Sequence, residues 1–465
     1  MTLPRPHVAI LGGGPGGYEA ALVASQLGAE VTVVDEDGLG GACVLTDCVP
    51  SKTLIESSST MTSLARAASL GIELADGANP ELGVDAPALY TRIKALAAAQ
   101  SNDIAEHVAG EGIRIIQARG RLTGPHTIEA AGTTVEADVV LIATGASPRA
   151  LPDGAPDGER ILTCRQIYDL PGLPEELIVV GSGVTGAEFA SAFQALGSQV
   201  TLVSSRERVL PHEDKDAAMV IESVFRRRGM NVLGKSRAES VHRKGDGVVV
   251  TLADGRQVTG SHCLLTVGMA PATSGIGLAQ AGVSLDSRGF IEVDRVSRTA
   301  VPGVYAAGDC TGVLMLASVA AMQGRIAMWH ALGEAVTPLR LSHVASTIFT
   351  DPEIASVGVS QAAVDRGEVA ARVVKLPLAT NPRAKMGGFR DGFVKLMARP
   401  GTGLVLGGVI VAPRASELIL PLSIAIEQNL SVDQIAQTFS VYPSLSGSVT
   451  EAARTVMEFA PDVIV

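Results

Sequence analysis

The chain has 465 residues, more than one ordinary hydrophobic core holds, which predicts two to four domains. Hydrophobic residues make up 46% of it and glycines number 51, a composition typical of an α/β protein with glycine-rich turns between buried strands. The net charge of −11 argues against a nucleic-acid-binding protein, and since no apolar run approaches about 20 residues and the N-terminus lacks a signal-peptide pattern, we expect a cytoplasmic protein with no integral membrane segment.

The first element along the chain is a predicted strand–turn–helix–strand unit that binds a dinucleotide. The apolar residues 7–11 lead into a turn with glycines at Gly12, Gly14 and Gly17, an alanine-rich helix follows, and a second strand ends at Asp35. In this context Gly12 permits the tight turn, Gly14 lets a pyrophosphate approach, and Gly17 lets the helix pack on the strand. The helix N-terminus supplies free N–H groups for phosphate, and Asp35 is placed to accept a hydrogen bond from a ribose hydroxyl.

Two cysteines, Cys43 and Cys48, follow this turn closely, and we predict that they form a redox-active pair that exchanges electrons with a flavin. Residues five apart on a regular helix lie about 7.5 Å apart along its axis, beyond the reach of most disulfides, so pairing requires a distorted first turn. A helix N-terminus also favours the thiolate form. Two unbonded core thiols, or half a metal site, are the alternatives. The remaining cysteines, which we expect to be small core residues, are Cys164, Cys263 and Cys310.

The same glycine pattern recurs at Gly181, Gly183 and Gly186, again between an apolar strand and a helix. Two such units in one chain indicate two dinucleotides, which suits a flavin and a nicotinamide that exchange a hydride. The position that holds the acid in the first unit holds Ser204 here, and Arg206 follows. An acid would repel a 2′-phosphate whereas serine and arginine attract it, so we expect NADPH as the donor, with NADH also possible. The alternative is an arginine that is merely solvated.

Motifs along the whole chain resemble those of the class I pyridine nucleotide–disulfide oxidoreductases, the family of lipoamide dehydrogenase and glutathione reductase. They include GGACVLTDCVPSK at residues 40–52, YAAGD at residues 305–309 and FTDPEIASVG at residues 349–358. The resemblance implies an α/β fold with two Rossmann-like dinucleotide-binding domains, for FAD and NAD(P), and a C-terminal α+β dimerisation domain that forms a homodimer. It assigns the FAD domain to residues 1–150 and 276–343, the NAD(P) domain to 151–275 and the dimerisation domain to 344–465.

The resemblance also implies roles for single residues. Cys48 would be the flavin-facing sulfur, and Cys43 the outer sulfur that exchanges with a substrate. Lys52 would lie beside the flavin N5 with Glu188 as its partner, and Asp309 would bind the flavin ribitol. Further cofactor contacts are implied for Pro15, Gly41, Ala143, Thr144, Gly145, Gly268, Gly308 and Ala317.

The chain departs from the family pattern at its C-terminal end. The family's HPTxxE motif carries a histidine that handles the proton of thiol exchange and a glutamate that orients it, but the matching positions hold Tyr442 and Gly447. Tyrosine is a poor base at neutral pH. We therefore expect a small-molecule acceptor that takes electrons directly from the flavin, a quinone above all, as in a lipoamide-dehydrogenase-like quinone reductase known from mycobacteria. The alternatives are a disulfide reductase of unusual substrate, a soluble transhydrogenase, or a mainly structural subunit of a dehydrogenase complex.

Overall fold

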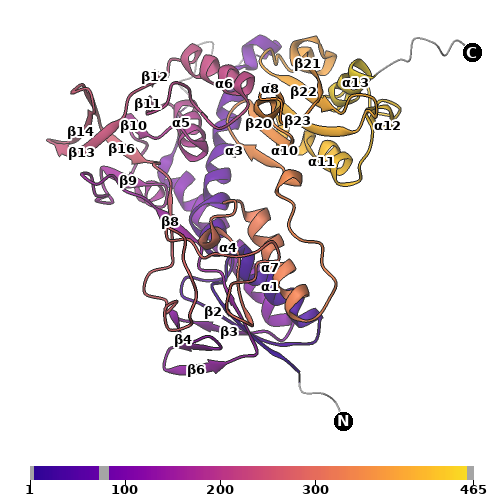
Figure 1. Ribbon diagram of the computed structural model, residues 1–465. Coiled ribbons are helices and arrows are strands. Elements are labelled where there is room, and N and C mark those ends of the chain that lie inside the picture. Colours follow the sequence, from indigo (N-terminus) through magenta and orange to yellow (C-terminus); the bar gives the residue numbers. More distant parts are fainter. Residues whose placement is uncertain (1–4, 73–82, 458–465) are drawn as a thin grey trace, which may run out of the picture.

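The computed structural model describes residues 5–72 and 83–457. Their three five-stranded sheets, two parallel and one antiparallel, are flanked by helices (Figure 1). The first sheet has the order β18-β7-β1-β2-β3, and all its pairings are parallel. Its three central strands are mainly buried aliphatic residues, as expected for a parallel sheet covered on both faces, whereas the edge strand β3 is only partly buried. The strands are β1 (His7–Leu11), β2 (Glu30–Asp35), β3 (Arg114–Gln117), β7 (Val139–Ile142) and β18 (Val304–Ala306).

Helices α1 (Pro15–Gln26) and α7 (Ala317–Ala331) lie side by side on this sheet (Figure 1). Their close approach depends on Gly324 of α7, where a Cβ atom would lie 2.1 Å from the Gly16 carbonyl oxygen of α1. Gly324 lies more than 300 residues after Gly16, so the packing of α1 depends on a segment far away in the sequence.

The second sheet repeats the first, with the parallel order β12-β11-β10-β16-β9. The third sheet, β19-β20-β23-β22-β21, is antiparallel and carries the C-terminal helices. The predicted fold class, two dinucleotide-binding units and a C-terminal α+β unit, is therefore confirmed. The strands are β9 (Ile161–Thr163), β10 (Glu176–Val180), β11 (Gln199–Val203), β12 (Asn231–Leu233), β16 (His262–Leu265), β19 (Ser346–Ile348), β20 (Glu353–Gly358), β21 (Arg372–Pro377), β22 (Phe393–Ala398) and β23 (Val405–Ala412).

Smaller sheets and further helices complete the described chain. The strands are β4 (Gly120–Gly124), β5 (Thr127–Ala130), β6 (Thr133–Glu136), β8 (Ala146–Pro148), β13 (Ala238–Lys244), β14 (Gly247–Leu252), β15 (Gln257–Gly260) and β17 (Met269–Pro271). The helices are α2 (Gly41–Leu45), α3 (Cys48–Ala65), α4 (Ala86–Gly110), α5 (Val184–Leu196), α6 (Lys215–Arg227), α8 (Gln361–Asp365), α9 (Pro382–Met386), α10 (Ala415–Leu418), α11 (Leu420–Glu427), α12 (Val432–Ala436) and α13 (Gly447–Val456). None of the helices within the described ranges is long and apolar enough to cross a membrane.

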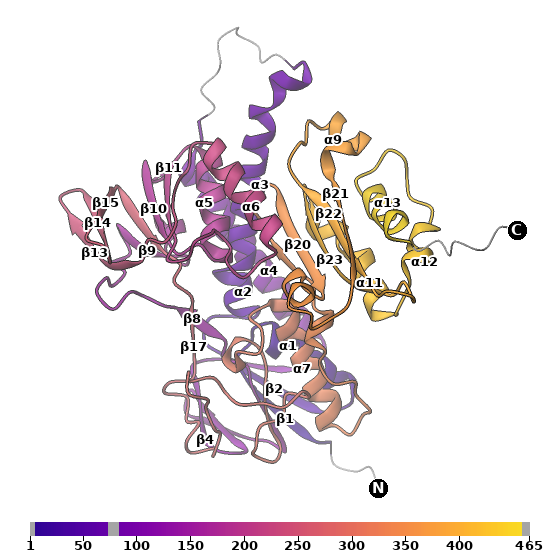
Figure 2. The same ribbon diagram turned by 45° about the horizontal axis from the view of Figure 1, so that its top comes forward.

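Ion pairs hold the second unit against the C-terminal sheet. Lys395 of β22 is only 2% exposed, and its Nζ lies 2.7 Å from a carboxylate oxygen of Asp214 and 2.9 Å from one of Asp216, at the start of α6. At the other end of α6, Arg227 pairs with Asp391 and Arg228 with Asp351. Helix α3 of the first unit runs between these two parts and packs on α5 (Figure 2). The three units therefore meet around α3, which begins at Cys48.

Candidate active site

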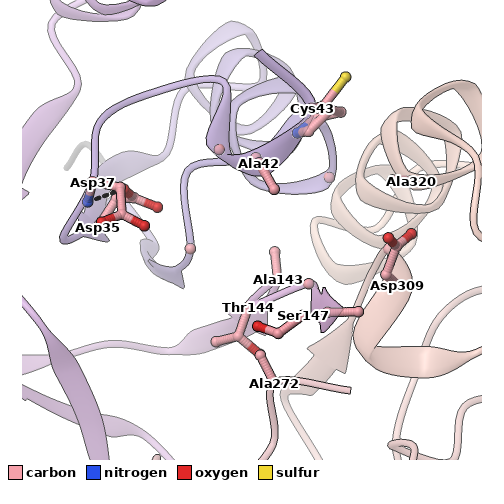
Figure 3. A pocket seen from close by; sticks show the side chains of 18 of the residues that line it. Asp35, Asp37, Ala42, Cys43, Ala143, Thr144, Ser147, Ala272, Asp309 and Ala320 are labelled. Atoms are coloured by element: carbon pink, nitrogen blue, oxygen red, sulfur yellow. Dashed lines mark hydrogen bonds between the residues drawn. The ribbon is translucent and has the colours of Figure 1, made fainter. Parts of the chain in front are cut away.

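A cavity of about 690 Å³ opens at the carboxyl ends of the first sheet, where open α/β sheets usually bind their ligands. Figure 3 shows Asp35 and Asp309 at opposite ends of it, with Ala143 and Thr144 between them. Most of the residues that the sequence assigns to a flavin site meet here. Those that line the cavity are Gly12, Gly14, Pro15, Asp35, Gly41, Cys43, Cys48, Ala143, Thr144, Gly145, Gly308, Asp309 and Ala317.

In the first glycine turn, Gly12 and Gly17 leave no room for a Cβ atom because backbone packs against them, whereas Gly14 has free space beside it. Gly12 has φ +107°, and a Cβ atom there would lie 2.3 Å from the Ala143 carbonyl oxygen. A Cβ on Gly17 would lie 1.9 Å from the Gly12 carbonyl oxygen, so helix α1 can approach the strand only because this residue is glycine. Around Gly14 nothing lies within 4 Å of such an atom, and α1 begins at the next residue. This is a cradle that a phosphate ligand fits.

Asp35 and Asp309, two of the acids that line the cavity, are held by the backbone in different ways. The Asp35 carboxylate accepts hydrogen bonds from the N–H groups of Gly13, Asp37 and Gly38, at 2.6, 2.9 and 2.8 Å, which fix it at the end of β2. Asp309 follows Gly308, whose φ of +84° makes the turn after β18. Burial, together with the nearby Asp47 carboxylate, raises the pKa of Asp309 to about 6.

The pKa of Asp309 predicts how the stability of the FAD-free protein depends on pH. Because the folded state favours the protonated acid, stability should fall as pH rises from about 4 to 6, by up to about 3 kcal/mol. We expect Asp309→Asn to remove this loss, so that the FAD-free variant is more stable than wild type at pH 7 and equal to it near pH 4, while it retains FAD less well. Urea unfolding at both pH values measures this, with Asp103→Asn, an exposed acid of α4, as the control.

The cysteines lie on two separate helices. Cys43 is in the short helix α2, the chain leaves helical geometry at Thr46 and Asp47, and Cys48 begins α3. This break supplies the distortion that the spacing requires. Both residues are free thiols in the structure. The hydrogen bond that Cys48 donates lowers the pKa of Cys43, although burial and Asp47 oppose that shift, and the same hydrogen bond raises the pKa of Cys48.

No second half of a metal site accompanies this pair. Within residues 5–72 and 83–457, no group of three or more His, Cys, Asp or Glu side chains is arranged to hold a metal ion. The three other cysteines are buried.

Lys52 lies one turn after Cys48 on α3, and its Nζ is 2.8 Å from the Glu188 carboxylate. Glu188, on α5, is 3% exposed, and its other oxygen accepts a hydrogen bond from the Phe349 N–H at 2.9 Å. Burial opposes the charge on Lys52, but Glu188 outweighs it and raises the pKa of this lysine. The predicted Lys52–Glu188 partnership is thus present, and it joins all three units next to Cys48, although neither Lys52 nor Glu188 is among the residues that line the cavity.

The second glycine turn has the geometry of the first. A Cβ on Gly181 would lie 2.3 Å from the Thr266 carbonyl oxygen, one on Gly186 would lie 1.9 Å from the Gly181 carbonyl oxygen, and nothing lies within 4 Å of one on Gly183. The Gly181 N–H donates to the Val203 carbonyl as the Gly12 N–H donates to Val34. The two turns therefore occupy equivalent places in their sheets.

Ser204 occupies the place of Asp35 in the second turn but does not face solvent. Its side chain is fully buried; its hydroxyl lies 2.6 Å from the Ser182 hydroxyl and 3.1 Å from the Arg206 carbonyl oxygen. The exposed residues of this turn are Ser205, Arg206 and Glu207. Ser204 thus holds the turn in shape, and Arg206 is one of three neighbouring residues that face solvent.

Several cavity residues escaped the sequence reasoning. Arg119 follows β3 at the same sheet edge as Asp35, so the rule that ligands lie beyond the carboxyl ends of parallel strands could have found it. Asp47 lies within the motif at residues 40–52, but the motif assigns it no role, and Arg165 and Met315 reach the cavity from segments outside the quoted motifs. Gly268, with φ +102°, lies just before the cavity residue Met269.

Between residues 440 and 457, no histidine and acid take the place of the missing dyad. Tyr442 is 82% exposed, and Gly447 begins α13. Glu451, the nearest acid that follows, is bound to the Arg454 guanidinium, with 3.0 Å between Oε2 and Nε. Proton handling by a histidine and an acid is therefore absent from this segment.

Two family models match the chain. The model described as pyridine nucleotide-disulphide oxidoreductase matches residues 6–324, and the model of the dimerisation domain of the same family matches residues 344–453. Together they cover most of the sequence. The stretch that resembled a dimerisation domain in the sequence is thus matched by one.

Relatives extend over nearly the whole chain. A protein of Mycobacterium tuberculosis named NAD(P)H dehydrogenase (quinone) is 57% identical over 465 residues, 97% of this chain and 94% of that protein. A dihydrolipoyl dehydrogenase of Thermus scotoductus is 32% identical over 461 residues, 98% of each chain. The crystal structure of LpdA from Mycobacterium tuberculosis superimposes with a TM-score of 0.93 at 56% identity, covering 97% of this chain and 100% of that one. This protein is therefore an enzyme of the pyridine nucleotide-disulphide oxidoreductase family.

Proposed function

We propose that this enzyme oxidises NADPH or NADH through a bound FAD and passes the electrons to a quinone-type small molecule. The observation that carries the proposal is an intact flavin cavity combined with Tyr442 and Gly447 where thiol exchange would need a histidine and an acid. The name of the 57% identical relative, NAD(P)H dehydrogenase (quinone), supports the same acceptor.

The residues of the cavity fit FAD. The open face of Gly14 and the N-terminus of α1 suit the pyrophosphate, and Asp35 suits a ribose hydroxyl. Asp309 would accept from the ribitol, and Lys52, held by Glu188, would place a positive charge near the flavin ring. When bound, the flavin supplies the chemistry of accepting a hydride from the nicotinamide and releasing two electrons. The residues of the cavity would hold and orient it.

The test of this function measures NADPH-dependent turnover of the purified protein with a quinone and with two disulfides, lipoamide and glutathione disulfide. We expect quinone turnover to exceed disulfide turnover by roughly 10²–10⁴, the usual contribution of general acid–base assistance. Cys43→Ser should leave quinone turnover within about twofold, because the outer sulfur is not on a direct route from flavin to quinone. Comparable rates with a disulfide, or loss of quinone turnover in Cys43→Ser with FAD retained, would favour a disulfide reductase instead.

Donor preference follows from the exposed turn after β11. We propose that Arg206 binds the 2′-phosphate of NADPH, since Ser204 is buried and no acid takes its place. A charged hydrogen bond contributes about 1.5–3 kcal/mol, so Arg206→Ala should lower kcat/KM for NADPH about tenfold or more and leave NADH nearly unchanged. Lys244→Ala, at the exposed end of β13, is the control. Equal losses with both donors would remove Arg206 from this role.

We also propose a homodimer formed through the C-terminal unit and a cytoplasmic location. Large apolar side chains stand exposed on the C-terminal unit, among them Leu420, Ile424, Phe439 and Val441, and a second copy would cover them. The five free cysteines suit a reducing compartment. Sedimentation of an active monomer at micromolar concentration would contradict the dimer.

A further inference from the structure

Asp47 is an acid in an unusual place beside the cysteine pair. It is the residue before α3, where Asp normally accepts a hydrogen bond from the helix N-terminus, but its side chain makes no such bond. Among the hydrogen bonds of the described residues, Asp47 takes part only through its backbone, with Ala42 and Ser51. Its side chain instead lines the cavity, directly before Cys48 in the chain.

The cations near Asp47 are engaged with other groups. Lys52 is bound to the Glu188 carboxylate at 2.8 Å, and Arg165 donates to the Ala146 carbonyl oxygen at 2.9 Å. Asp309, across the cavity, is another acid. The neutral groups close enough to feel the Asp47 charge are Cys43, Cys48, Cys164 and Tyr168. Asp47 therefore adds a negative charge at the helix end that would otherwise favour a thiolate.

We propose that Asp47 disfavours the thiolate form of the Cys43–Cys48 pair and thereby keeps reducing equivalents on the flavin, where a direct acceptor can take them; the second part rests on the proposed quinone function. Two-electron reduction of a Cys43–Cys48 disulfide by the reduced flavin breaks the Sγ–Sγ bond and takes up one proton. It leaves one thiol and one thiolate, and the flavin returns to its oxidised form. A neighbouring carboxylate raises the free energy of that thiolate. Electron transfer from the flavin to a quinone forms no thiolate and escapes this cost.

Burial acts on Asp47 in the opposite direction: it raises the pKa of this acid and so disfavours its charged form, and Lys52 and Arg165 only partly offset that rise. The Asp47 charge in turn raises the pKa of both cysteines, whereas Lys52 lowers it. Removing the Asp47 charge would take away one of the effects that oppose Lys52 and the end of α3, while burial of both thiols and the Asp309 charge near Cys43 would remain.

The experiment measures the rate at which iodoacetamide alkylates Cys43 and Cys48 in the fully reduced, FAD-containing protein from pH 5 to 10, with peptide mass spectrometry as the readout. Asp47→Asn should shift the apparent pKa of the faster thiol down by about one unit, so that alkylation near neutral pH is about tenfold faster. Asp47→Glu keeps the charge and should behave as wild type. Glu56→Gln removes an exposed charge two turns along α3 and should also leave the rate unchanged.

The outcomes separate this proposal from the proposed function. Equal alkylation rates in wild type and Asp47→Asn, or an equal gain in Glu56→Gln, would overturn it even if quinone turnover is fast. A tenfold gain specific to Asp47→Asn, in a protein that reduces no quinone, would support control of the thiols by Asp47 and overturn the quinone function. If the Asp47→Asn protein loses FAD, Asp47→Ser takes its place in the experiment. The same gain in alkylation rate is expected for Asp47→Ser, and an unchanged rate would contradict the proposal.

Discussion

The double variant Tyr442→His with Gly447→Glu is expected to raise turnover of lipoamide by roughly 100-fold over wild type, because it restores a base and the acid that orients it. Quinone turnover should stay within about twofold, since no thiol exchange takes part in it. The site can accept both side chains. Tyr442 is 82% exposed, and a Cβ on Gly447 would meet only the Ser444 and Ser440 hydroxyls, at 3.5 and 3.8 Å.

Steady-state kinetics with both acceptors measure this effect, and each single variant should gain far less than the pair. The matched control is Thr438→His with Gly447→Glu, which places the histidine on an exposed polar residue of the same segment but out of register. A gain of similar size in the control would mean that the new histidine acts without a defined position. No gain in the double variant would show that the dyad is not what limits disulfide turnover.

Alanine at Gly17 should impair FAD binding, whereas alanine at Gly186 should impair NADPH binding. In each variant the added Cβ would lie 1.9 Å from a carbonyl oxygen that cannot move away easily. Gly17→Ala should bring FAD content from about one per chain to less than a tenth of that. Gly186→Ala should retain FAD but raise KM for NADPH at least tenfold. Flavin absorbance and stopped-flow reduction by NADPH measure the two effects separately.

Two further alanine substitutions separate the effect on the stability of each turn from the effect on ligand binding. Gly14 and Gly183 have nothing within 4 Å of an added Cβ, so alanine there should leave the unfolding midpoint nearly unchanged while it obstructs the pyrophosphate. Gly110→Ala, at the end of α4, has equal room and no ligand role, and it should change neither. Full FAD content in Gly17→Ala would contradict the assignment of the first turn to FAD.

The sequence predicted the two turns well because their geometry is local. The spacing that equates Asp35 with Ser204 agrees with the structure, where both residues follow matching strands. Burial of Ser204 was not predictable, since it depends on the Ser182 hydroxyl and on the backbone of the following turn. Folding also brings Arg165 to the cavity from after β9, far from the glycine turn in sequence.

The cysteines show where local reasoning is incomplete. A helix N-terminus should favour a thiolate at either of them, and the break at Thr46 and Asp47 does place Cys48 at such an end. The acid at that end acts against the helix, however, and Lys52 is shared with Glu188 on another unit. The balance of charge on the thiols therefore depends in part on the contact between Lys52 and Glu188, which the short motif around the cysteines does not contain.

The pairing of β18 with β7 has a consequence for synthesis on the ribosome. Strand β7 ends at Ile142, but its neighbour on that side, β18, begins only at Val304. At about 5–20 residues per second, the nascent chain waits roughly 10–30 s for the missing strand. Throughout that interval the edge of β7 is open to pairing with other chains, and Asp309 has not yet emerged to meet a flavin. Such exposure would be detected as chaperone binding to nascent chains that are stalled after β7 and before β18.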